Sequence, residues 1–153
     1  MNLSLSNVSK STTLEPGLLQ AYGETHYCVT PDSPEAEPLV LRVGQNSQPL
    51  RALHKKYAVD CSAFITAFNP WSKSFSEAEN ASRHEGLLKV LRARSLRWID
   101  GIGIHPSNQW PGETSVLILG LSLAAAKVLA EDFEQNAFVW SGVDTKPQLV
   151  LLR

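Results

Sequence analysis

Cysteine is scarce in this chain of 153 residues: only Cys28 and Cys61 are present, and no Cys-x-x-Cys pair occurs. Each thiol stands alone in an apolar, strand-like stretch, so we expect two free, packed cysteines rather than a disulfide. The histidines also lack the paired spacing of metal ligands. No metal site is therefore predicted. The four histidines are His26, His54, His84 and His105.

Familiar nucleotide-binding and hydrolase motifs are absent as well. The sequence contains neither a phosphate-binding P-loop nor a Gly-x-Ser-x-Gly nucleophile elbow. Gly101 and Gly103 lack the third glycine and the following helix of a dinucleotide-binding fingerprint. No cofactor follows from the sequence.

The chain also lacks an excess of either charge, with 14 Lys and Arg residues against 15 Asp and Glu residues. No overall field favours nucleic acid or an anionic membrane, so neither is an expected partner. A basic cluster follows the longest predicted helix, where cations match the negative helix end. Its members are Lys89, Arg92, Arg94 and Arg97.

No apolar run is long enough to span a bilayer, and the first residues do not resemble a secretory signal. We therefore expect a cytoplasmic protein. Apolar residues make up 43% of the chain, which is enough for a packed core. We expect a loose segment over 1–12 and one globular domain over 13–153.

Hydrophobic periodicity predicts four helices and seven strands. Hairpin-like strand pairs mix with helical connections, which predicts an α+β domain in which helices pack on a mixed β-sheet. The expected helices cover 14–22, 50–57, 76–93 and 122–133, and the expected strands cover 26–30, 39–43, 61–68, 98–104, 114–119, 137–140 and 148–152.

The start of the third helix carries several polar groups. Ser76 and Glu79 have the spacing of a capping box, and Ser74 with Glu77 forms a competing one. Capping explains Glu79 as a structural residue. The functional alternative is that Glu79 acts as a base or binds a ligand hydroxyl.

Asn80 and Arg83 extend the apolar stripe of Leu87 and Leu91 towards the helix start, so they point inward or lie at the rim of the core. An arginine in such a place needs a partner. Arg83 either pairs with Glu79 or another core carboxylate, or it clamps an anionic ligand beside the free N–H groups of the helix start.

Three further segments carry polar or aromatic groups. Asn69 precedes Pro70 at a strand end, where it is either a plain turn residue or part of a site. Trp110 and Glu113 follow a strand, and the tryptophan either packs the loop or covers a flat ligand. Gln135 and Asn136 follow a helix. Asn136 is either the left-handed residue that ends this helix or, with Gln135, a pair of ligand-reading amides.

The segments FITAFNPWS, ENASR, GIGIHPSNQWPGETSVLILGLS and AKVLAEDFEQNAFVW together resemble a small bacterial family that is defined only as a domain of unknown function. The resemblance covers about Phe64 to Leu151 and implies no activity, cofactor or substrate. It implies that eight residues mark the family: Asn69, Glu79, Asn80, Arg83, Trp110, Glu113, Gln135 and Asn136. Polar markers at element ends suit a site better than a scaffold.

We therefore predict one polar pocket that binds a small anionic, nucleotide-like molecule. The protein either converts this molecule in a reaction or only binds it. The guanidinium would hold the anion, the amides would orient the ligand and the tryptophan would cover it. The alternative is a protein-interaction module that binds or inhibits a partner. The predicted ligand-binding residues are Asn69, Asn80, Arg83, Trp110, Gln135 and Asn136, and the predicted acid–base residues are Glu79 and Glu113.

Overall fold

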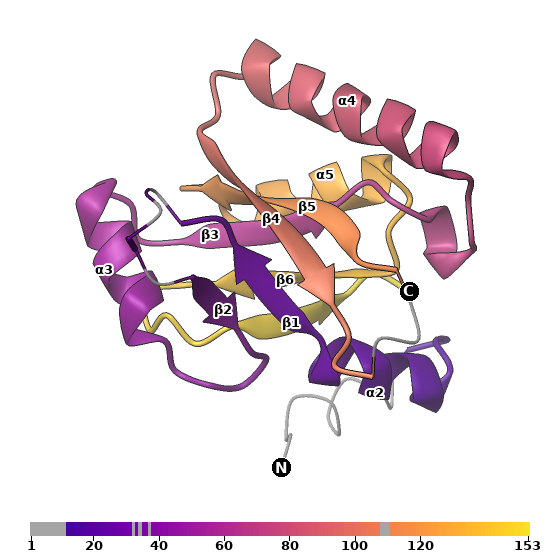
Figure 1. Ribbon diagram of the computed structural model, residues 1–153, viewed down its shortest axis with the longest axis horizontal. Helices are drawn as coiled ribbons and strands as arrows, with labels where there is room; N and C mark the ends of the chain where they lie inside the picture. Colours follow the sequence, from indigo (N-terminus) through magenta and orange to yellow (C-terminus); the bar gives the residue numbers. More distant parts are fainter. Residues whose placement is uncertain (1–11, 32, 34, 37, 108–110) are drawn as a thin grey trace.

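The computed structural model describes residues 12–31, 33, 35–36, 38–107 and 111–153. Its centre is one curled seven-stranded sheet in the order β2-β1-β4-β5-β3-β6-β7 (Figure 1). The architecture confirms the α+β class. The strands are β1 (His26–Val29), β2 (Leu39–Leu41), β3 (Ser62–Thr66), β4 (Trp98–Ile104), β5 (Glu113–Leu119), β6 (Ala137–Ser141) and β7 (Gln148–Leu151).

The sheet is antiparallel at every pairing of the described strands, so the prediction of a mixed sheet was wrong. The helical connections do join strands that run in the same direction, as the sequence order indicated. In each case, however, at least one other strand lies between the two. β5 lies between β3 and β4, and β3 lies between β5 and β6.

Two hydrophobic cores lie on opposite faces of the sheet. Leu87 and Leu91 of α4, together with Leu129 of α5, pack on one face. Leu50 of α3 and Tyr22 of α2 belong to the core on the other face. The helices are α2 (Pro16–Glu24), α3 (Gln48–Lys56), α4 (Glu77–Ala93) and α5 (Leu123–Asp132), and a short 3₁₀ turn, η1, covers Pro70–Ser72.

Helices α3, α4 and α5 end in the same way. In each, a residue with positive φ follows the last turn, and two backbone N–H groups return to the helix in a Schellman motif. These left-handed residues are Ala58, Ser95 and Glu134, with φ of 55°, 54° and 59°. The left-handed residue that ends α5 is therefore Glu134 and not Asn136, because the 6→1 bond joins Gln135 N to Ala130 O.

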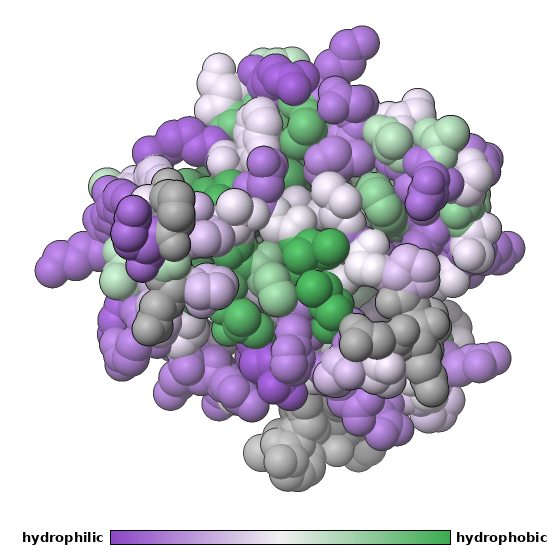
Figure 2. Space-filling model, in the orientation of Figure 1, coloured by the Kyte–Doolittle hydropathy of each residue, from purple (hydrophilic) through white to green (hydrophobic). Residues whose placement is uncertain are grey.

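One face of β1 and β4 is not covered by a helix (Figure 1). Apolar side chains gather there near the centre of Figure 2, within a ring of hydrophilic ones. Cys28 on β1 is paired with Val40 on β2 and with Ile102 on β4. Val40 is 41% exposed and Ile102 is 36% exposed.

Both cysteines are free thiols. None of the helices in the described ranges is long and apolar enough to cross a membrane.

Candidate functional site

The turn after β3 has an unusual backbone. Asn69, Trp71 and Ser72 all have positive φ, at 48°, 55° and 59°. Asparagine tolerates this conformation, but a bulky tryptophan rarely adopts it. The turn is held by Trp71 N, which donates to Glu134 O at 2.7 Å, and by Ser72 N, which donates to Asn69 O at 2.8 Å. Strained backbone of this kind is concentrated at functional sites in proteins.

Two amides connect this turn to the start of α4. Asn69 N donates to Asn80 Oδ1 at 2.8 Å, and Asn80 Nδ2 donates to Asn69 Oδ1 at 3.0 Å. Asn69 Oδ1 also accepts from Phe75 N at 3.0 Å, which fixes the approach to the helix. The remaining group, Asn69 Nδ2, donates to Glu113 Oε2 at 2.8 Å. Asn69 is thus the link between the helix start and the first residue of β5.

Arg83 is used on the protein itself. Its Nε donates to Ala67 O at 2.8 Å, and its NH2 group donates to Phe133 O at 2.6 Å. Its NH1 group lies 3.4 Å from a carboxylate oxygen of Glu134. The guanidinium therefore joins the end of β3 to the end of α5, where a cation also matches the negative helix terminus. The carboxylate partner that the sequence left open is Glu134, not Glu79.

The Gln135–Asn136 turn completes the cluster from the other side. Gln135 Nε2 donates to Phe68 O at 3.0 Å, and Asn136 Nδ2 donates to Ser72 Oγ at 3.0 Å. Ser72 Oγ is also 2.5 Å from the hydroxyl of Tyr22 on α2. Asn136 Oδ1 accepts from Arg153, 3.4 Å away.

Arg153 forms an exposed cationic rim beside these groups. Its guanidinium carbon lies 4.5 Å from the centre of the Trp71 ring, which is a cation–π arrangement. The aromatic ring limits where the guanidinium can lie, and Arg153 as a whole residue is exposed. This placement suits contact with an anionic group better than the internal position of Arg83.

Glu113 is the distinctive charged group of the cluster. Burial raises the pKa of its carboxyl group, and the hydrogen bond from Asn69 only partly offsets that effect. Within the described part of the chain, Glu113 takes part in no ion pair. Burial also raises the pKa of Tyr22, and the charge of Glu113 acts in the same direction. The hydroxyl of Tyr27 donates to Tyr22 O at 2.6 Å. Burial raises the pKa of Tyr27, and the charges of Tyr22 and Glu113 act in the same direction.

The structure brings most of the predicted residues together around the turn after β3. Asn80 approaches Asn69 directly, while Arg83 and Gln135 bind the carbonyl groups of the two residues before it. Glu79 instead faces solvent and closes the capping box with Ser76 at 3.1 Å in both directions, so the Ser76 box forms and the Ser74 alternative does not. Trp110 lies outside the described residues.

Sequence reasoning missed Tyr22, Ser72 and Arg153. Tyr22 and Arg153 lie far from the turn in the sequence, and no motif joins them to it. Ser72 gave a weak signal, since it follows Asn69-Pro70-Trp71 directly. No group of three or more His, Cys, Asp or Glu side chains suited to a metal ion occurs among the residues that the structure describes.

Comparisons with known proteins give one family match. Residues 65–138, just under half of the chain, match the model of a family described as "Protein of unknown function (DUF3293)". The chain is therefore similar to a family without an assigned activity, and the matched range includes the turn, α4 and Glu113. No curated protein and no solved structure matches the chain.

Proposed function

We propose that the protein binds a small anionic molecule beside Glu113, and that this carboxyl group exchanges a proton with the bound molecule. The observation that carries the proposal is a mostly buried carboxyl group with a raised pKa and one amide partner, which has no cationic partner among the described residues. Such a group is unfavourable for stability as an ion, but it suits general acid–base chemistry.

The residues around Glu113 divide into two roles in this proposal. Ser72 and Tyr22 offer hydroxyl groups for hydrogen bonds to the molecule, Arg153 receives its anionic group, and the buried amide of Asn136 orients Ser72. The other predicted ligand-binding residues, Asn69, Asn80, Arg83 and Gln135, hold the strained turn in place through their internal hydrogen bonds. The covering role of Trp110 stays a prediction.

An anionic molecule is compatible with Glu113 because a carboxyl group with a raised pKa keeps its proton at higher pH. The protonated form does not repel an anion, and it can donate its proton to a basic oxygen or nitrogen atom. Perturbed titratable groups that cluster beside strained backbone are a recognised mark of functional sites. Tyr22, Tyr27 and Glu113 form such a cluster beside Ser72.

A thermal-shift screen against nucleotides, sugar phosphates and carboxylic acids tests the proposal. We expect at least one compound to stabilise the protein, by about 2.7 kcal/mol at a concentration about 100 times its Kd. The shift, measured against each variant's own melting temperature, should shrink in Glu113→Gln. It should persist in Glu85→Gln, a matched change on the exposed face of α4. Equal shifts in both variants, or no stabilising compound, would refute the proposal.

A further inference from the structure

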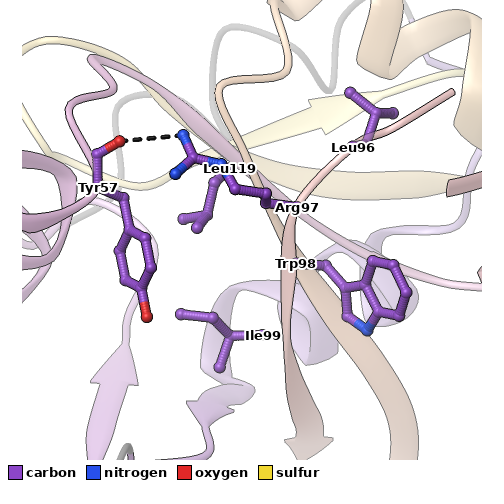
Figure 3. A pocket seen from close by; sticks show the side chains of 6 residues that line it. All are labelled: Tyr57, Leu96, Arg97, Trp98, Ile99 and Leu119. Carbon is purple, nitrogen blue, oxygen red and sulfur yellow. Dashed lines mark hydrogen bonds between the residues drawn. The ribbon is translucent and has the colours of Figure 1, made fainter. Parts of the chain in front are cut away.

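A surface hollow lies away from Glu113, at the other end of β4 and β5. It has a volume of about 370 Å³ and lies beside the connection between α4 and β4 (Figure 3). Tyr57 and Ile99 point into the same space, with Leu119 behind them, whereas Trp98 lies on the far side of β4. A smaller hollow of about 230 Å³ shares Ile99 and extends the groove along α3.

The surroundings of this hollow are basic. It contains Arg97 and no carboxylate among the described lining residues. The guanidinium of Arg97 lies 5.7 Å from the centre of the Tyr57 ring and donates to Tyr57 O at 3.0 Å. Arg92 lies over the ring of Trp98 at 6.0 Å. Both cations belong to the basic cluster in the sequence.

Within the described ranges, Lys89, Arg92, Arg94 and Arg97 form no ion pair with an Asp or Glu side chain. Of these four cations, Arg97 lines the hollow, where a cation without an acidic partner attracts an acidic ligand. The apolar floor of Ile99 and Leu119 adds a place for a hydrophobic side chain. Charge and shape therefore indicate the same kind of occupant.

We propose that this hollow, which we call the Arg97 groove, binds an acidic segment of a partner protein, with one large apolar side chain placed between Tyr57 and Ile99. Carboxylates of the segment contact Arg97, because a guanidinium group binds carboxylates well. The adjoining smaller hollow receives the next side chain on the same side of an extended segment. The groove is separate from the Glu113 site, so this proposal does not depend on the proposed function.

A nucleic acid suits the Arg97 groove less well. Single-stranded nucleic acids stack their bases on open aromatic faces. The Trp98 side chain packs against the core beneath α4, and the ring of Tyr57 already carries the guanidinium of Arg97. The cations therefore meet apolar surface rather than a stacking platform.

Selection of random peptides displayed on phage against the full chain tests the proposal. We expect the enriched peptides to combine several Asp or Glu residues with a large apolar residue. A synthetic copy should bind more weakly as salt rises from about 0.05 to 0.5 M. Replacement of its apolar residue by alanine should also weaken binding.

The variant Arg97→Gln should reduce the affinity of that peptide at least about tenfold. Arg51→Gln is the matched control, because Arg51 is also exposed and also donates to a backbone carbonyl, Asp144 O, at 3.3 Å. Its affinity should stay within about twofold of the unaltered protein. Circular dichroism and melting temperature confirm that both variants fold.

Three outcomes would overturn the proposal. Selection enriches no peptide, or enriches peptides without acidic residues. The enriched peptide binds Arg97→Gln as well as it binds the Arg51→Gln control. A labelled oligouridylate binds the protein through Arg97 and displaces the peptide, which would show that the groove is a nucleic-acid site.

Discussion

Single residues in the polar cluster have different roles, although the sequence presents them as one set. Both the oxygen and the nitrogen of the Asn69 side-chain amide bond to protein groups, and Asn80 forms two hydrogen bonds with Asn69. These amides specify the shape of a strained turn. Among the described residues, Glu113 has one hydrogen-bond partner and no cationic partner, so its ionised form is poorly stabilised. The cluster is thus a rigid support around one carboxyl group.

Replacement of Arg83 by alanine should lower the free energy of unfolding by about 2–4 kcal/mol, because hydrogen bonds from a charged group to Ala67 O and Phe133 O are lost. Chemical denaturation measures this loss. Lys89→Ala, on the exposed surface of the same helix, should change stability by less than about 0.5 kcal/mol. A near-neutral Arg83→Ala would instead assign the guanidinium to a ligand rather than to the fold.

At the scale of elements, the helix ends carry avoidable strain. A non-glycine residue in the left-handed conformation costs about 1–2 kcal/mol, yet three helices of this fold end on one. Glu134 is explained by its contact with Arg83. Ala58 is exposed, and no side-chain contact explains it. The left-handed residue that ends α5 therefore also contributes to the polar cluster, whereas the one that ends α3 only ends its helix.

Ala58→Gly should raise the melting temperature, with a gain in stability of about 0.5–1 kcal/mol, because glycine adopts positive φ without steric cost. An alanine-to-glycine substitution inside the helix should have the opposite effect on stability. Ala52→Gly, at an exposed position of α3, should destabilise by about 1 kcal/mol. If both substitutions destabilise, the strain at Ala58 is not relieved by glycine and the argument fails.

At the scale of the whole molecule, local patterns were sufficient for the elements but not for their arrangement. Each predicted helix and strand has a counterpart whose ends lie within two residues. Ser76 and Ser122 predicted the starts of their helices correctly, because capping depends only on residues close in sequence. The insertion of β5 between β3 and β4 is a long-range choice, and no short motif encodes it.

The candidate site shows the same limit. The sequence identified Asn69, Asn80 and Glu113 as polar residues at element ends, and they do meet. It could not show that Arg83 would bind backbone carbonyl groups, because carbonyl groups carry no sequence signal. It also could not place Tyr22 beside Ser72, fifty positions away in the chain.

The central claim is that Glu113 is kept for function at the expense of stability, and its pH dependence has a definite sign. Its pKa is raised above the ordinary value of 4.5 in the folded protein. Between that value and the folded pKa, the folded state binds more protons than the unfolded state. The contribution of Glu113 to stability therefore falls as pH rises through this window, and the full penalty is present above the folded pKa.

The most direct test is the free energy of unfolding of Glu113→Gln against the unaltered protein, measured from about pH 4 to pH 8, with Glu85→Gln as the control. Glutamine keeps an acceptor for Asn69 Nδ2 and removes the poorly solvated charge. We expect the variant to be more stable by about 0.5–2 kcal/mol at pH 8, with the gain shrinking towards pH 4 and no such trend in the control. A Glu113→Gln protein that is less stable at pH 8 would show that the carboxylate stabilises the fold, and would contradict the account.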